Sequence, residues 1–184
     1  LAPVVTESLG WRAPFALSGL AALASAALIL TARAGPAFKR AARFDPRAIN
    51  LSLTDPALAR VNLGYLGHMW ELYAFWAWVG VFLTIWSEQN VVSSAFSVPV
   101  TTFIIVAAGA LGALGAGWLA DRVGRTLVTS VAMALSGGCA LLSAWAWSGP
   151  AALMIGLLVI YGVTVIADSA QFSAAAAALA PPDK

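Results

Sequence analysis

Five long apolar segments constrain the fold more than any other feature of this sequence. They lie at approximately 14–33, 61–86, 98–120, 126–147 and 151–178. Each meets or approaches the roughly 20 helical residues needed to cross a hydrocarbon core of about 30 Å. Because lipid offers the backbone no hydrogen-bond partner, segments of this length span a membrane as helices. The sequence therefore predicts an all-α, multi-pass membrane protein with five transmembrane helices.

Composition supports the same class. Hydrophobic residues make up 61% of the chain and charged residues only 10%, whereas about a quarter of the residues in a soluble domain are charged. A net charge of +2 would suggest a nucleic-acid partner for a soluble chain, but here the basic residues follow the apolar spans. We therefore expect a lipid bilayer as a partner and no nucleic acid.

The distribution of basic residues predicts the topology. Residues 33–60 contain six Lys and Arg residues, the 87–97 loop contains none, and the 121–125 turn contains two. By the positive-inside rule the first and third of these segments are cytoplasmic, which places the N-terminus outside. Within the long loop, residues 37–47 are compatible with a short interfacial helix or with a solvated linker.

Small and aromatic residues indicate what the spans contact. Ala108, Gly112 and Ala116 recur at four-residue spacing in the third span, which allows close approach of a neighbouring helix. This face is expected to pack against protein. Tryptophans near the predicted outer ends are interpreted as anchors at the membrane interface: Trp86, Trp145 and Trp147.

The sequence GWLADRVGR, residues 117–125, lies in the predicted cytoplasmic turn between the third and fourth spans. A Gly, an Asp-Arg pair and a Gly-Arg pair in such a turn are similar to the signature turn of the major facilitator superfamily of secondary transporters. In that family the turn occurs between the second and third helices and again between the eighth and ninth. Here a further helix and a long basic loop precede it, so it resembles the second copy.

On this resemblance, residues 1–33 correspond to the end of the N-terminal half with the sixth helix, and residues 34–60 to the central cytoplasmic loop. Residues 61–184 correspond to helices seven to ten, most of the C-terminal half. The resemblance implies a fragment of a longer bacterial inner-membrane protein, with the remaining helices of the full-length chain as partners. The first span should then pack less tightly than the other four.

Ionisable side chains inside the spans are confined to two of them: His68 and Glu71 in the second, and Asp168 in the fifth. A charge at mid-membrane costs about 2.5–3.5 kcal/mol on the insertion scale, so such groups face water or one another. The helical rise places Glu71 and Asp168 in the cytoplasmic half, within about one turn of depth. The resemblance implies that helices seven and ten line a central cavity.

Helical periodicity extends these residues into two polar stripes. We interpret the stripes as a substrate or proton pathway; the alternative is that His68 and Glu71 only fix helix packing. The second span contributes Tyr65, His68 and Glu71, followed by Phe75, and the fifth contributes Tyr161, Thr164, Asp168 and Gln171.

The signature turn provides a second candidate site. The resemblance implies that its aspartate joins a charge network that holds the cytoplasmic side closed. The alternative is that its charges serve only the topology. The residues concerned are Gly117, Asp121, Arg122, Gly124 and Arg125.

The functional prediction is a secondary active transporter that moves a small solute by alternating access, with a proton as a candidate coupling ion. An intramembrane enzyme is not expected, because the chain has one histidine, one cysteine and neither an HExxH nor a GxSxG motif. No catalytic residue, metal or cofactor is predicted. A non-transporting scaffold or receptor on the same fold is the alternative, and it would tolerate loss of Glu71 and Asp168.

Overall fold

A computed structural model describes residues 2–32, 47–90 and 97–179. Over these ranges the chain forms eight helices and no strand, which confirms the all-α prediction. Five helical segments are long and apolar enough to cross a membrane, also as predicted. The candidate interfacial helix at 37–47 falls almost entirely outside the described residues. The chain divides into two compact units, Leu1–Arg43 and Phe44–Lys184.

The first unit contains α1 (Ala2–Leu9) and α2 (Ala13–Thr31). Gly10 lies between them with φ +82°, a backbone conformation that favours glycine. The apolar α2 corresponds to the first predicted span and has no buried residue. Each of the other four spans buries at least 28% of its most apolar window. Because α2 belongs to a separate unit, the looser packing expected of this span stays a prediction.

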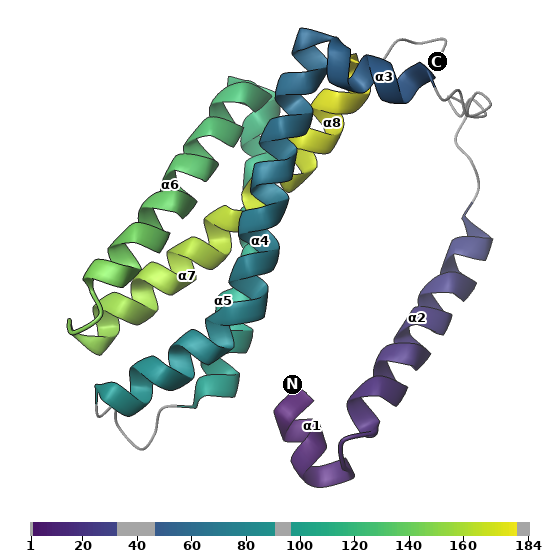
Figure 1. Cartoon of the computed structure of the whole chain (residues 1–184). Coiled ribbons are helices and arrows are strands. Elements are labelled where there is room, and N and C mark those ends of the chain that lie inside the picture. Colours follow the sequence, from purple (N-terminus) through teal and green to yellow (C-terminus); the bar gives the residue numbers. More distant parts are fainter. Residues whose placement is uncertain (1, 33–46, 91–96, 180–184) are drawn as a thin grey trace. The chain divides into compact units, whose positions relative to one another are not determined.

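The second unit is a bundle of six helices (Figure 1). Four of the predicted spans correspond to elements of this bundle, and the last span is divided in two. The helices are α3 (Arg47–Thr54), α4 (Pro56–Gln89), α5 (Val98–Val123), α6 (Arg125–Trp145), α7 (Ala151–Ala167) and α8 (Ser169–Leu179). α7 packs against α5 and α6, whereas α8 packs mainly against α4.

α4 begins earlier than the sequence pattern predicted. Asp55 caps it, because its side-chain oxygen accepts hydrogen bonds from the backbone N–H groups of Ala57 and Leu58, both at 2.9 Å. Proline at the first helical position fits the same start. With 34 residues, α4 is about 51 Å long and exceeds the hydrocarbon core. The segment interpreted as loop therefore includes α3 and the first turn of α4.

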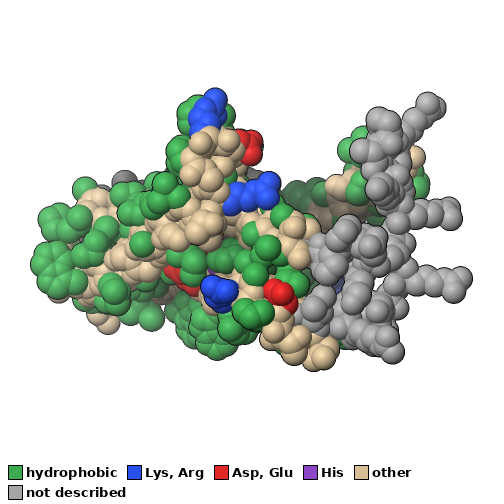
Figure 2. Space-filling view, turned by 90° about the horizontal axis from the view of Figure 1, so that it is seen from above, with side chains coloured by type: hydrophobic (Ala, Val, Ile, Leu, Met, Phe, Trp, Pro, Cys, Tyr) green, Lys and Arg blue, Asp and Glu red, His purple; other side chains and the backbone are tan. Residues whose placement is uncertain are grey.

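The core of the bundle lies where α4 meets α7. Buried side chains of α4 recur every three or four residues along one face, as expected for an amphipathic helix: Leu72, Phe75, Val79, Leu83 and Trp86. They pack against Met154, Leu158 and Val165 of α7 and Ile105 of α5. Large apolar side chains also remain exposed on the outside, and Figure 2 shows much more hydrophobic than charged surface, as the lipid-facing surface of a membrane protein requires.

Glycines bring α5 and α7 into close contact. A Cβ at Gly112 would collide with the carbonyl oxygen of Val163, and one at Gly162 with that of Ile105. The predicted packing face is thus confirmed at Gly112 and at Ala116, which is buried. Gly109 is also buried against α7, where a Cβ would meet the carbonyl oxygen of Gly162 at 3.0 Å. A Cβ at Gly115 or Gly117 would have no neighbour within 4 Å, so these two glycines do not share this role.

Trp86 is not the interface anchor that its position suggested. Its side chain is fully buried in the bundle, and its indole N–H donates a hydrogen bond to the carbonyl oxygen of Trp147 at 3.0 Å. That bond ties the end of α4 to the connection between α6 and α7. Trp145, by contrast, is 81% exposed, as an anchor would be.

α5 and α6 meet at Gly124, within the signature turn. Its φ of +94° and ψ of +146° lie in a backbone region that glycine adopts without strain and other residues do not.

We expect Gly124→Ala to lower the free energy of unfolding by about 1–3 kcal/mol, because alanine would be strained in this conformation. Thermal unfolding in detergent, followed by tryptophan fluorescence, measures this loss of stability. Gly115→Ala is the matched control; equal stability of the two variants would contradict the explanation.

Candidate functional site

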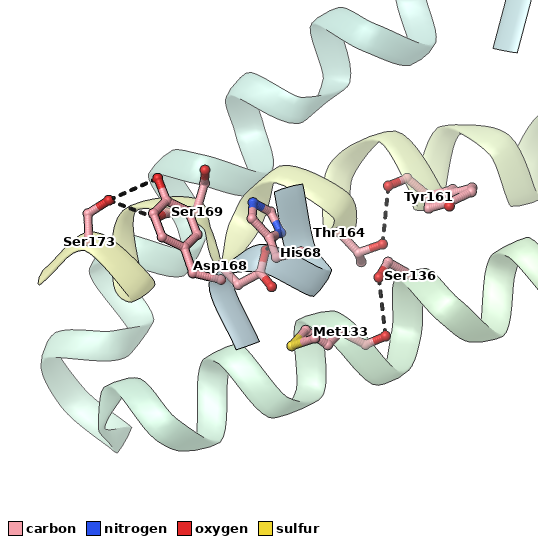
Figure 3. Close-up of polar contacts among 9 residues, drawn as sticks. His68, Met133, Ser136, Tyr161, Thr164, Asp168, Ser169 and Ser173 are labelled. Carbon is pink, nitrogen blue, oxygen red and sulfur yellow. Dashed lines mark hydrogen bonds and ion pairs between the residues drawn. The ribbon is translucent and has the colours of Figure 1, made fainter. Parts of the chain in front are cut away.

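Residues of the two polar stripes meet inside the second unit, where His68 and Asp168 form a buried contact. His68 of α4 lies beside Asp168 (Figure 3), with 3.0 Å between its Nδ1 and the carboxylate Oδ1. Each residue is 1% exposed. These are the two ionisable residues that the structure buries most completely within its described part, and they come from elements a hundred residues apart in sequence.

A break in the last span brings Asp168 to this position. Asp168 caps the end of α7. Its carbonyl oxygen accepts hydrogen bonds from the backbone N–H groups of Gln171 and Phe172, at 2.9 and 3.1 Å, and these two bonds lie in the first turn of α8. The predicted fifth span at 151–178 is confirmed as a single span, Ala151–Leu179, but its interruption at Asp168 was not predicted. Interrupted helices are a common way for transporters to place polar groups at membrane depth.

Aromatic rings cover the ion pair on the side of α8. Phe172 stacks on Tyr65, with 5.6 Å between ring centroids, and lies 5.7 Å from the His68 ring. Tyr65 also stacks on His68 at 6.1 Å. The hydroxyl of Ser173 donates a hydrogen bond to the Tyr65 hydroxyl at 3.3 Å. α4 and α8 are thus joined by alternating aromatic and polar contacts.

Glu71 lies one turn further along α4 and continues the contact toward α7. It is half-buried, and it interacts electrostatically with Tyr161. The Tyr161 ring packs on Phe75, with 4.3 Å between centroids. The structure therefore brings together five of the seven residues of the predicted pathway: Tyr65, His68, Glu71, Tyr161 and Asp168.

Several polar atoms at this contact are buried without a hydrogen-bond partner among the described residues. They include His68 Nε2 and Glu71 Oε1, and the Asp168 Oδ1 that faces His68 lacks the alignment of a hydrogen bond. A buried unsatisfied group costs about 1–3 kcal/mol, so groups of this kind mark functional sites. Within the described ranges, no three His, Cys, Asp or Glu side chains are grouped to hold a metal ion.

The other two predicted pathway residues point elsewhere. The Thr164 hydroxyl donates to the carbonyl oxygen of Ile160 at 2.9 Å, and its side chain lines an apolar groove between α5, α6 and α7. Gln171 lines a cavity between α4, α6 and α8, together with Arg125. Neither side chain joins the ion pair.

The charged residues of the signature turn, Asp121, Arg122 and Arg125, are exposed. Arg122 stacks over the Trp118 ring, 3.6 Å from its centroid, and donates to the carbonyl oxygen of Trp118. Arg125 donates at 3.5 Å to the carbonyl oxygen of Ala174 in α8. Asp121 forms no ion pair with another described residue, so the charge network around it stays a prediction.

Sequence reasoning missed Phe172 and Ser173, which contact Tyr65 across the two helices. On an unbroken helix Phe172, four residues after Asp168, would lie on the same face as Asp168, whereas Ser173 would lie outside the stripe. No proline or glycine near Asp168 indicates the break, so the only signal was the polar cluster of Asp168, Ser169 and Gln171 in an alanine-rich segment.

The comparisons with known proteins identify one family. A family model described as Major Facilitator Superfamily matches residues 1–184, the whole chain. Neither the search of curated proteins nor that of solved structures returned a match. The family match extends well beyond the turn at 117–125 that first suggested the resemblance.

Proposed function

Because the chain belongs to the major facilitator superfamily of membrane transporters, we propose that it acts as a secondary active transporter of a small solute, driven by protons through alternating access. The observation that carries the proposal is the buried His68–Asp168 pair with Glu71 one turn away. Ionisable groups kept inside a membrane are expensive and are usually functional. These three come together at the contact of α4 with α7 and α8.

In this mechanism, protonation changes the number of charged groups that are buried where α4 contacts α7 and α8. Protonated His68 and ionised Asp168 neutralise each other, and the pair can be covered by the rings of Tyr65 and Phe172. An ionised Glu71 adds an unpaired charge, which favours a hydrated, open cavity. Protonation of Glu71 removes that charge and favours closure. Release of the proton on the other side of the membrane then permits reopening there, which couples proton flow to solute movement.

The proposal assigns a different role to each residue. Glu71 is the coupling carboxylate, because its Oε1 has no partner among the described residues. His68 and Asp168 form the buried pair that holds the two helices in register. Tyr65 and Tyr161 present hydroxyl groups beside these charges, so the transported solute is expected to carry hydrogen-bonding groups.

Solute uptake tests this function directly. Membrane vesicles that contain the full-length protein are given a panel of radiolabelled small solutes, with an imposed proton gradient or with the gradient collapsed by a protonophore. We expect at least one solute to accumulate above its equilibrium level only when the gradient is present. Accumulation that is indifferent to the gradient would refute proton coupling. A scaffold or receptor would move none of the solutes.

We also propose that the signature turn stabilises the inward-closed state through Asp121. Asp121→Asn keeps the shape of the side chain and removes its charge. Uptake should fall by about tenfold, which corresponds to a shift of about 1.4 kcal/mol between the two states, with near-normal amounts of protein in the membrane. Glu88→Gln, an exposed acid at the far end of α4, is the control. Unchanged uptake by Asp121→Asn would leave the turn with a topological role alone.

A further inference from the structure

A cavity with several polar side chains in its lining lies between α4, α6 and α8 of the bundle. It has a volume of about 240 Å³ and contains no carboxylate. Its polar lining consists of one cation, three hydroxyl groups and one amide: Arg125, Thr126, Thr129, Ser130 and Gln171. Its apolar wall includes Phe172, and the ring of Phe172 also contacts the rings of Tyr65 and His68. The cavity is therefore separate from the His68–Asp168 pair, and the Phe172 ring lies between them.

Gln171 points to a ligand in this cavity. Its side chain is only 6% exposed and lines the cavity, yet it forms no hydrogen bond with any described residue. The amide atoms of Gln171 are not among the fully buried atoms without a partner, so the amide lies against the open space of the cavity and not against packed protein. Its N–H groups are thus available to an acceptor that enters the cavity.

The hydroxyl groups of α6 are available as well. Elsewhere in the bundle, helical Ser and Thr hydroxyls donate to carbonyl oxygens of the preceding turn, as at Thr84, Ser143 and Thr164. Among the described residues, Thr126, Thr129 and Ser130 have no such hydrogen bond. Three free donors on one cavity wall fit a ligand that is rich in acceptor oxygens.

The positive charge of Arg125 favours a ligand that is an anion as well as rich in acceptor oxygens. Arg125 makes one long hydrogen bond, 3.5 Å to the Ala174 carbonyl oxygen, and keeps its other donors free. The cavity adjoins the N-terminus of α6, where unpaired backbone N–H groups and the helix dipole favour negative charge. We propose that this cavity binds a phosphate-type oxyanion, with Arg125 as its charge partner and Gln171, Thr129 and Ser130 as hydrogen-bond donors.

Binding of radiolabelled inorganic phosphate to the purified full-length protein tests the site. We expect saturable binding that Arg125→Gln weakens by about tenfold or more, because a charge-assisted hydrogen bond is lost. Arg122→Gln removes the same charge three residues away, outside the cavity, and should leave the affinity within about twofold. Non-saturable binding by the natural protein, or equal weakening by the two variants, would overturn the proposal.

A second variant keeps the test valid if Arg125→Gln folds poorly. Thr129→Val is nearly isosteric, leaves every charge in place, and should weaken phosphate binding by about tenfold through one lost hydrogen bond to a charged ligand. An affinity equal to that of the natural protein would contradict the assigned lining. Elution as a single peak in gel filtration verifies that each variant is folded.

The phosphate group could come from a soluble metabolite or from a lipid head group, and nanodiscs distinguish the two sources. The same titration is carried out in phosphatidylcholine discs and in discs that also contain phosphatidylglycerol. Weaker phosphate binding in the anionic discs, by the natural protein but not by Thr129→Val, supports a lipid head group at the site. Equal affinity in both discs supports a soluble phosphate compound. Absence of saturable binding in both discs would refute the site.

Discussion

Gly112→Ala is expected to lower the free energy of unfolding of the bundle by about 3 kcal/mol, at the upper end of overpacking effects. The added Cβ would meet the backbone carbonyl of Val163 in α7, and a backbone atom cannot move aside as a flexible side chain can. α5 and α7 would have to separate along their whole contact. Gly115→Ala, on the open side of the same helix, is the control.

Unfolding of the purified protein in mixed detergent micelles, followed by tryptophan fluorescence, measures this difference. Alanine is a better helix former than glycine by about 1 kcal/mol, so the control should be as stable as the natural protein or more stable. Similar midpoints for Gly112→Ala and Gly115→Ala would show that α5 and α7 do not approach as closely as the structure has them.

Breaking the buried ion pair should have the largest effect of all. Asp168→Leu leaves His68, 1% exposed, without its partner, and removal of one member of a buried pair typically costs about 3–5 kcal/mol. The double variant His68→Phe with Asp168→Leu replaces both charges with apolar groups. It should recover most of the loss, because such replacements are often close to neutral in stability.

A double-mutant cycle on the free energy of unfolding separates these terms. We expect the double variant to be more stable than Asp168→Leu alone and to be inactive in transport. If the two single effects simply add, His68 and Asp168 do not interact and the pair cannot hold α4 against the junction of α7 and α8. The natural protein and His68→Phe complete the cycle.

The sequence was sufficient for the spans, and it named five residues that lie close together in the structure. Hydropathy and length located five spanning segments because lipid leaves the backbone no alternative to the helix. The polar stripes indicated which side chains face water or one another, and the family resemblance indicated that the second and fifth spans line one cavity. The contact of His68 with Asp168 was not itself predicted.

Other features depend on tertiary contacts that a sequence pattern does not contain. The break at Asp168 has no proline or glycine to indicate it, and Gln171 lines the cavity between α4, α6 and α8 instead of contacting His68. Thr164 satisfies its hydroxyl on its own helix, an option that every helical threonine has. A tryptophan near the end of a span, such as Trp86, can face lipid or lie buried. Trp86 is buried because its indole N–H donates a hydrogen bond to the Trp147 carbonyl oxygen, a tertiary contact.

We propose that a proton on Glu71 drives solute movement through the contact of α4 with α7 and α8. Concentrative uptake by the full-length Glu71→Gln protein, measured across a range of external pH, tests it most directly, with Glu88→Gln as the matched control. Glutamine keeps the shape and hydrogen bonding of Glu71 but cannot release a proton. We predict that Glu71→Gln no longer accumulates solute against its gradient and that its remaining uptake is independent of pH. Concentrative uptake with an unaltered pH dependence would make Glu71 a packing residue and contradict the mechanism.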